Sequence, residues 1–245
     1  MNARWCVITV VVAVISGAAV AVADEPNSAA ARKIIDRAIE AAGGREALNR
    51  YEKPFRLERK GKSFVGGDID FTLRSTTWLP DKLRTEEELN RNGQKTSLGV
   101  RINGEKGFYL PANRELDGRG LGNIRELLYG YWLATLLPLD DPQFELTALD
   151  EVMLEGRSAV GVKISCKERP DVRLYFDKEA MTLVKLARQF NDRLFEERYD
   201  DFAELEGLVY PKKIVQYANG NKFVEMETIG FKFLDKVDDA IFEQP

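Results

Sequence analysis

The chain has 245 residues, of which 44 % are hydrophobic and 31 % are charged, a composition typical of a globular protein with one or two domains. Its net charge is −4, and nucleic-acid binding is disfavoured because phosphate recognition needs clustered positive charge. The sequence contains no histidine, which excludes Ser-His-Asp and Cys-His nucleophilic sites and metal sites with imidazole ligands.

Residues 1–23 are typical of a secretory signal peptide. Arg4 gives a positive start, residues 7–22 form an apolar run, and Ala21-Val22-Ala23 matches a small-x-small cleavage pattern. The run is short for a membrane span of about 20 residues, so cleavage is favoured over an uncleaved anchor. The mature chain is therefore expected to be 24–245, a single exported domain of the periplasm or cell envelope. Cleavage would bring the charge to −5 and leave Cys166 as the one cysteine, without a disulfide.

The first element of the mature chain is an amphipathic helix within residues 29–44. Ile34, Ile35, Ala38 and Ile39 recur at helical spacing. Asn27 or Ser28 is the expected cap, and Gly43-Gly44 ends the helix. We expect this helix to pack on a sheet.

The spacing of apolar residues then changes to every second residue, which is typical of a strand. Residues 66–80 place Ile69, Phe71 and Leu73 on one side of a strand and polar residues on the other. A second strand follows Pro80, and Asn92-Gly93 and Asn103-Gly104 are hairpin turn signals. These strands predict an antiparallel meander.

The pattern breaks at residues 118–141, where an apolar helix is expected after Asn123, its predicted cap. Residues 118–122 carry glycines at the wrong spacing for a dinucleotide fingerprint and are expected to be a loop. Leucines and aromatic residues leave the helix little polar face, so it must be enclosed on most sides. Because it lies between two runs of strands, it is expected to fill or cover the concave side of a sheet.

Strands resume from residue 142 to the end, with turn signals that include Glu155-Gly156, Glu206-Gly207 and Asn219-Gly220. Ten or eleven strands with two or three helices predict a mainly β (α+β) fold, one curved antiparallel sheet in a single domain.

The sequence offers no positive sign of catalysis. The stretch around Ser158 is not a nucleophile elbow, because the following glycine is one place too far. Acidic pairs such as Asp140-Asp141 and Asp200-Asp201 are neighbours in sequence, and on a strand such neighbours point to opposite faces. No enzymatic activity, cofactor or metal is predicted.

Three stretches together resemble the periplasmic outer-membrane lipoprotein carriers, the LolA/LolB-like family. Residues 100–111 have its turn and aromatic strand, at Asn103-Gly104, Phe108-Tyr109 and Pro111. Residues 68–88 are similar to its long strand, proline and following strand, at Pro80 and Leu83-Arg84. Residues 229–245 are similar to its closing strand and terminal Phe-x-x-Pro, at Phe242 and Pro245.

The sequence also departs from the family's pattern at one place. In the carrier an arginine that precedes the proline helps to hold the lid helix closed, whereas Leu79 stands at that place here.

The resemblance implies an unclosed β-barrel, a half-barrel whose concave side holds acyl chains of a lipid or lipidated protein beneath an N-terminal helix and a helical lid. It also implies an envelope membrane protein as a further partner, and we expect a monomer. Phe108 and Leu110 would face the cavity, with Tyr109 on the other side. The implied cavity-lining residues are Ile69, Phe71, Leu73, Leu83, Phe108, Leu110, Leu128, Trp132, Leu133, Leu136, Leu174 and Phe176.

Two other hypotheses stand beside the binding protein. A non-catalytic structural or interaction module of the same fold predicts a filled core and a sheet edge used for partners. A histidine-free enzyme predicts two carboxyl groups close together in a cleft, with shifted pKa values.

Overall fold

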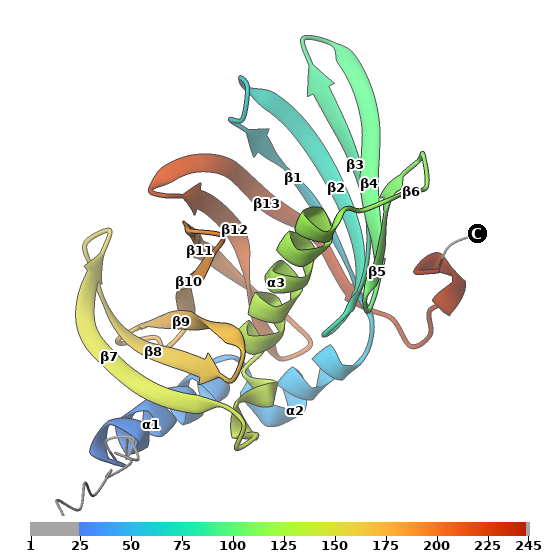
Figure 1. The fold of residues 1–245 in the computed structure, drawn as a ribbon. Coiled ribbons are helices and arrows are strands. Elements are labelled where there is room, and N and C mark those ends of the chain that lie inside the picture. Colours follow the sequence, from blue (N-terminus) through green and yellow to red (C-terminus); the bar gives the residue numbers. More distant parts are fainter. Residues whose placement is uncertain (1–24, 244–245) are drawn as a thin grey trace, which may run out of the picture.

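The computed structural model describes residues 25–243 (Figure 1). The predicted signal peptide, residues 1–23, and the terminal Pro245 lie outside these residues. Within them, no helix is long and apolar enough to cross a membrane.

A single antiparallel sheet of thirteen strands dominates the structure. The strands are β1 (Phe55–Ser63), β2 (Ile69–Trp78), β3 (Lys82–Arg91), β4 (Gln94–Asn103), β5 (Lys106–Leu110), β6 (Arg114–Glu115), β7 (Glu145–Leu154), β8 (Arg157–Cys166), β9 (Arg169–Asp177), β10 (Leu183–Phe190), β11 (Arg193–Leu205), β12 (Leu208–Ala218) and β13 (Asn221–Phe233). The sheet runs from β6 through β1 to β13 and on to β7, so the two halves of the chain join where β1 pairs with β13. β6 and β7 remain as unpaired edges, and the sheet curves into an open half-barrel (Figure 1). The predicted fold class is confirmed, although β1 and β6 were not predicted.

The hairpin turns fall where the sequence predicts them. At Asn92-Gly93, Glu155-Gly156 and Asn219-Gly220 both residues have positive φ, which is the conformation of the two-residue turns that join twisted antiparallel strands. These turns keep neighbouring strands in register, so alternate side chains face the concave side along a whole strand.

The N-terminal helix α1 (Glu25–Ala41) packs on β7 and β8 through the buried Ala31, Ile35, Ala38 and Ile39. It begins before Asn27 and Ser28, so neither residue is its cap. Gly43 follows with φ of 108°, and a β-carbon there would lie 1.9 Å from the Gly207 carbonyl oxygen. The short helices α2 (Gly44–Leu48) and η1 (Asn49–Glu52) then lead into β1.

The apolar helix α3 (Gly118–Ala134) runs across the hollow of the half-barrel (Figure 1). It begins earlier than predicted, because the Asp117 carboxylate accepts a hydrogen bond from the Gly120 amide at 2.6 Å. Residues 118–122 are therefore helix and not loop, and Asn123 is not the cap. The chain leaves α3 through Leu136, at φ of 65°, into η2 (Leu137–Asp140). A last 3-10 turn, η3 (Asp239–Ile241), follows β13.

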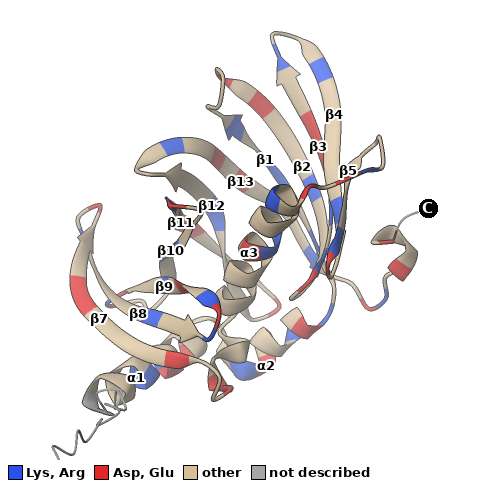
Figure 2. Ribbon diagram, viewed as in Figure 1, with Lys and Arg blue, Asp and Glu red and all other residues tan. Residues whose placement is uncertain are grey.

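Buried side chains form two clusters on the concave side. The larger joins α1 and the C-terminal end of α3 to β7–β13 and to Phe71 of β2, and the smaller joins the start of α3 to β3 and β4. Acidic and basic residues are interspersed along the strands and are not gathered into a region of one sign (Figure 2).

Candidate functional site

A cavity of about 570 Å³ lies between the concave face of the sheet and α3. Alternate residues of the strands line it, as the period of two requires. On β2 these are Ile69, Phe71, Leu73, Ser75 and Thr77, while Asp70 and Thr72 face the opposite side of the sheet. The alternation predicted for this strand is confirmed.

α3 supplies one wall of the cavity. Leu127, Leu128, Tyr131, Ala134 and Thr135 line it at spacings of one, three and four residues, which brings them to one side of a helix. The opposite side of α3 contacts the sheet, where a β-carbon on Gly130 would lie 3.7 Å from the side chains of Leu186 and Arg188 of β10. The helix therefore fills part of the hollow, as the sequence predicts, and leaves the cavity beside it. A filled core, which the interaction-module hypothesis predicted, is not observed.

The structure brings together seven of the twelve residues proposed from the sequence. Those that line the cavity are Ile69, Phe71, Leu73, Leu83, Leu128, Leu136 and Phe176. Their role in ligand binding stays a prediction.

Three of the remaining five belong to the packed core. Leu133 and Leu174 have no exposed surface and lie in the larger buried cluster. Trp132 packs edge-on against Phe144, with 5.9 Å between the ring centres. Trp132 and Leu133 lie on a different side of α3 from the cavity-lining residues and attach the helix to the core. Leu174 shares its face of β9 with the cavity-lining Phe176 but is fully covered by the packed core.

The faces expected for β5 are reversed. Tyr109 packs inward with the smaller buried cluster, and a β-carbon at Gly107 would meet the side chains of Leu116 and Ile102. Since neighbours alternate, Phe108 and Leu110 point to the convex side, where Leu110 lines a separate cleft beside Arg101. The glycine, and not an aromatic residue, makes room on the concave side for the start of α3.

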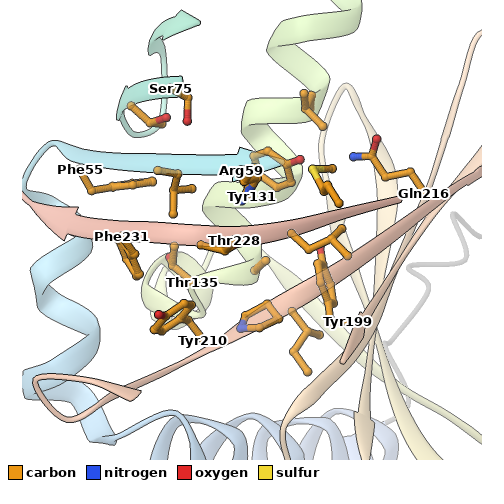
Figure 3. Close-up of a pocket in the computed structure, with 18 of the residues that line it drawn as sticks. Phe55, Arg59, Ser75, Tyr131, Thr135, Tyr199, Tyr210, Gln216, Thr228 and Phe231 are labelled. Atoms are coloured by element: carbon orange, nitrogen blue, oxygen red, sulfur yellow. The ribbon is translucent and has the colours of Figure 1, made fainter. Parts of the chain in front are cut away.

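The cavity also contains charged residues that the sequence did not predict. Among its lining residues, all of which belong to the described part of the chain, Arg59 of β1 is the only basic and Glu87 of β3 the only acidic one. Arg59 pairs with Leu73 of β2, and Leu73 pairs with Glu87, so the three form a row across the sheet. On the other side Arg59 pairs with Thr228 of β13. Figure 3 shows Arg59 beside the ring of Tyr131.

A buried ion pair lies next to this row. The Arg188 guanidinium is 3.2 Å from the Glu197 carboxylate, which is 2 % exposed and also accepts a hydrogen bond from the Tyr199 hydroxyl at 3.3 Å. Burial raises the pKa of Tyr131, and the negative charge of Glu197 adds to that rise. Tyr131 and Tyr199 both line the cavity, so the ion pair interacts with two of its polar side chains.

Burial also changes the pKa of Glu87, the acidic residue of β3 in the cavity lining. It raises the pKa of the Glu87 carboxyl, because loss of water disfavours the ionised form. The cavity is thus mainly apolar, with a strip of polar groups across it. No group of three or more His, Cys, Asp or Glu within residues 25–243 is arranged to hold a metal ion.

No protein-family model and no curated protein matches the sequence. Solved structures do match the fold. A LolA superfamily protein from Nitrosomonas europaea has a TM-score of 0.58 at 11 % identity, covering 87 % of this chain and 97 % of that one. A domain from Vibrio parahaemolyticus, described as an outer membrane lipoprotein-sorting protein, has a TM-score of 0.54 at 10 % identity, covering 86 % and 97 %.

A DUF1329 family protein from Desulfovibrio piger has a TM-score of 0.55 at 11 % identity, covering 87 % of this chain and 97 % of that one. All three likenesses extend over most of residues 25–243. At such low identities they concern the fold, and the resemblance inferred from the sequence is confirmed at that level: the chain has a LolA-like fold.

Proposed function

We propose that this protein is an exported, non-catalytic binding protein of the cell envelope that holds the acyl chain of a lipid or lipidated protein in the cavity beside α3. The observation that carries the proposal is the cavity itself. Its volume of about 570 Å³ lies within the usual range for small-molecule sites, and most of its lining is aliphatic or aromatic. The LolA-like fold supports the same reading.

The physical basis is the transfer of apolar surface out of water. Each methylene group buried in such a cavity contributes about 0.8 kcal/mol, so ten of them give about 8 kcal/mol before the costs of binding are subtracted. The affinity should therefore rise with chain length until the cavity is full.

A pair of adjacent substitutions tests the proposal. Leu89 of β3 lines the cavity and is only partly buried, while Asn90 lies on the opposite face of the strand and is exposed. Leu89→Asp would place a charge against the bound chain, where an ion without a partner is strongly disfavoured. Asn90→Asp adds the same charge outside the cavity and keeps an oxygen to accept the hydrogen bond from the Gly93 amide.

Displacement of a fluorescent fatty acid would measure binding, with circular dichroism to verify that both variants fold. We expect Leu89→Asp to weaken binding more than about tenfold, a cost of 1.4 kcal/mol, and Asn90→Asp to bind as the parent does. Equal binding by both folded variants would refute the cavity as the site.

Export is tested separately. Cell fractionation with N-terminal sequencing of the mature protein should find the chain in the envelope or periplasm and beginning at Asp24. A cytoplasmic protein with an intact N-terminus would contradict this part of the proposal.

A further inference from the structure

Arg59 is a charged group in an apolar surrounding without a charged partner. Its Nε atom is buried and has no hydrogen-bond acceptor among the described residues. None of the ion pairs found within residues 25–243 includes its guanidinium, although it is the sole basic group lining the cavity. A guanidinium in such a place is costly unless an anion or several acceptors compensate it.

The nearby groups of the protein do not supply that compensation. Glu87 lies two strands away in the same row, about 10 Å between α-carbons at the usual strand spacing, with Leu73 between them. Glu197 is already paired with Arg188. Tyr131 and Tyr51 are close enough for the Arg59 charge to oppose the rise of their pKa values, but their hydroxyls are neutral.

The position of Arg59 suits a ligand with one polar end. Leu57 and Phe55 precede it on the cavity side of β1, so a chain lying against them would bring its end to the guanidinium. Arginine presents a planar set of N–H donors that matches the two oxygens of a carboxylate or phosphate. Burial raises the pKa of Glu87, the acidic group at the other end of the row, because loss of water disfavours its ionised form.

We infer that the ligand is an anionic amphiphile, whose carboxylate or phosphate binds Arg59 inside the cavity while its acyl chain occupies the apolar lining. This inference rests on the proposed function and names the chemical class of its ligand.

Three ligands with the same sixteen-carbon chain separate the contribution of the head group from that of the chain. They are hexadecanoate, hexadecyl phosphate and hexadecanol, each used below its aggregation limit in calorimetry or in displacement of a fluorescent probe. The proteins are the parent, Arg59→Met, Arg59→Lys and the control Arg74→Met. Arg74 lies on β2 and faces away from the cavity, with its side chain 70 % exposed.

We expect the parent to bind at least one of the two anions about tenfold or more tightly than hexadecanol, as a charge-assisted hydrogen bond predicts. Arg59→Met should lose this preference and still bind hexadecanol, Arg59→Lys should keep part of it, and Arg74→Met should keep all of it. The anion that binds more tightly identifies the head group as carboxylate or phosphate.

Equal binding of the three ligands by the parent would overturn the inference and leave the proposed acyl-binding function unaffected. This result needs only the parent protein, so it holds even if Arg59→Met does not fold. A preference that survives in folded Arg59→Met would also overturn it. Failure of the parent to bind any of the three would instead refute the proposed function, and this inference with it.

Discussion

Replacement of Glu197 by glutamine should strongly destabilise the fold. The carboxylate is 2 % exposed, and it faces Arg188, whose side chain is 10 % exposed. Glutamine keeps an oxygen that accepts a hydrogen bond from the guanidinium but removes the compensating charge. Arg188 would then be a buried cation without an opposite charge, held by that hydrogen bond and by its contact with the ring of Phe195, at 5.5 Å.

The size of the effect follows from these contacts. Breaking a buried pair by removing one partner costs about 3 to 5 kcal/mol. Because glutamine keeps one hydrogen bond to Arg188, we expect a smaller loss of about 2 to 3 kcal/mol for Glu197→Gln, at or below the lower limit of that range. Replacing both partners, as Glu197→Gln with Arg188→Met, should recover at least about 1 kcal/mol of the summed single losses, since neither charge is then left alone.

Urea unfolding of the parent, the two single variants and the double variant would measure this coupling as a double-mutant cycle. The midpoints and slopes must be compared together, because a changed slope signals a changed unfolded state. A loss below about 0.5 kcal/mol for Glu197→Gln, or strict additivity in the double variant, would refute the account of a tightly coupled buried pair.

Three further perturbations follow from the structure. Burial raises the pKa of Glu87, so the stability contributed by its protonated carboxyl is full below the unfolded-state pKa and is lost as the pH rises through the folded-state pKa. Glu87→Gln should remove this pH dependence of the unfolding free energy, measured by urea unfolding at several pH values. An unchanged pH dependence would contradict the prediction. Asp117→Ala removes the cap of α3 and should cost about 1 kcal/mol, measured by the same unfolding curves against Asp117→Asn, which keeps an acceptor; an equal loss in both would contradict the cap. Gly61→Ala would put a β-carbon 2.2 Å from the Glu225 carbonyl oxygen and should lower stability by about 1 to 3 kcal/mol, whereas an unchanged melting temperature would show that β1 and β13 do not approach so closely.

The strands with one polar face were predictable from the sequence. The residues from Ile69 to Thr77 alternate between apolar or small and polar, and the period of two fixes which of them face the hollow. α3 was also predictable as an enclosed helix, since Asn123 is the sole exposed residue between Gly120 and Leu139.

The inward charge at Arg59 was not predictable. β1 has the sequence FRLERKGKS, in which charged residues occupy both faces after Leu57, so periodicity does not reveal which of them is inside. Its pairing with β13, at the opposite end of the chain, decides that Arg59 faces the cavity.

The reversal of β5 has a similar cause. Phe108 and Leu110 are the larger apolar residues, and apolar size favours the inward face when only the strand itself is considered. The start of α3 lies so close to this strand that glycine is required on the inward side at Gly107, where Leu116 and Leu121 occupy the space. Contacts between distant elements, which a single sequence does not show, therefore determine which face of β5 points inward.

The most direct test of acyl binding is native mass spectrometry of the protein, purified gently from the cell fraction in which it is found. The account predicts a bound species with the mass of an acyl lipid or lipopeptide, one per chain, that is released on denaturation. A clean mass of the protein alone, with no uptake when lipid or lipopeptide is added, would contradict it.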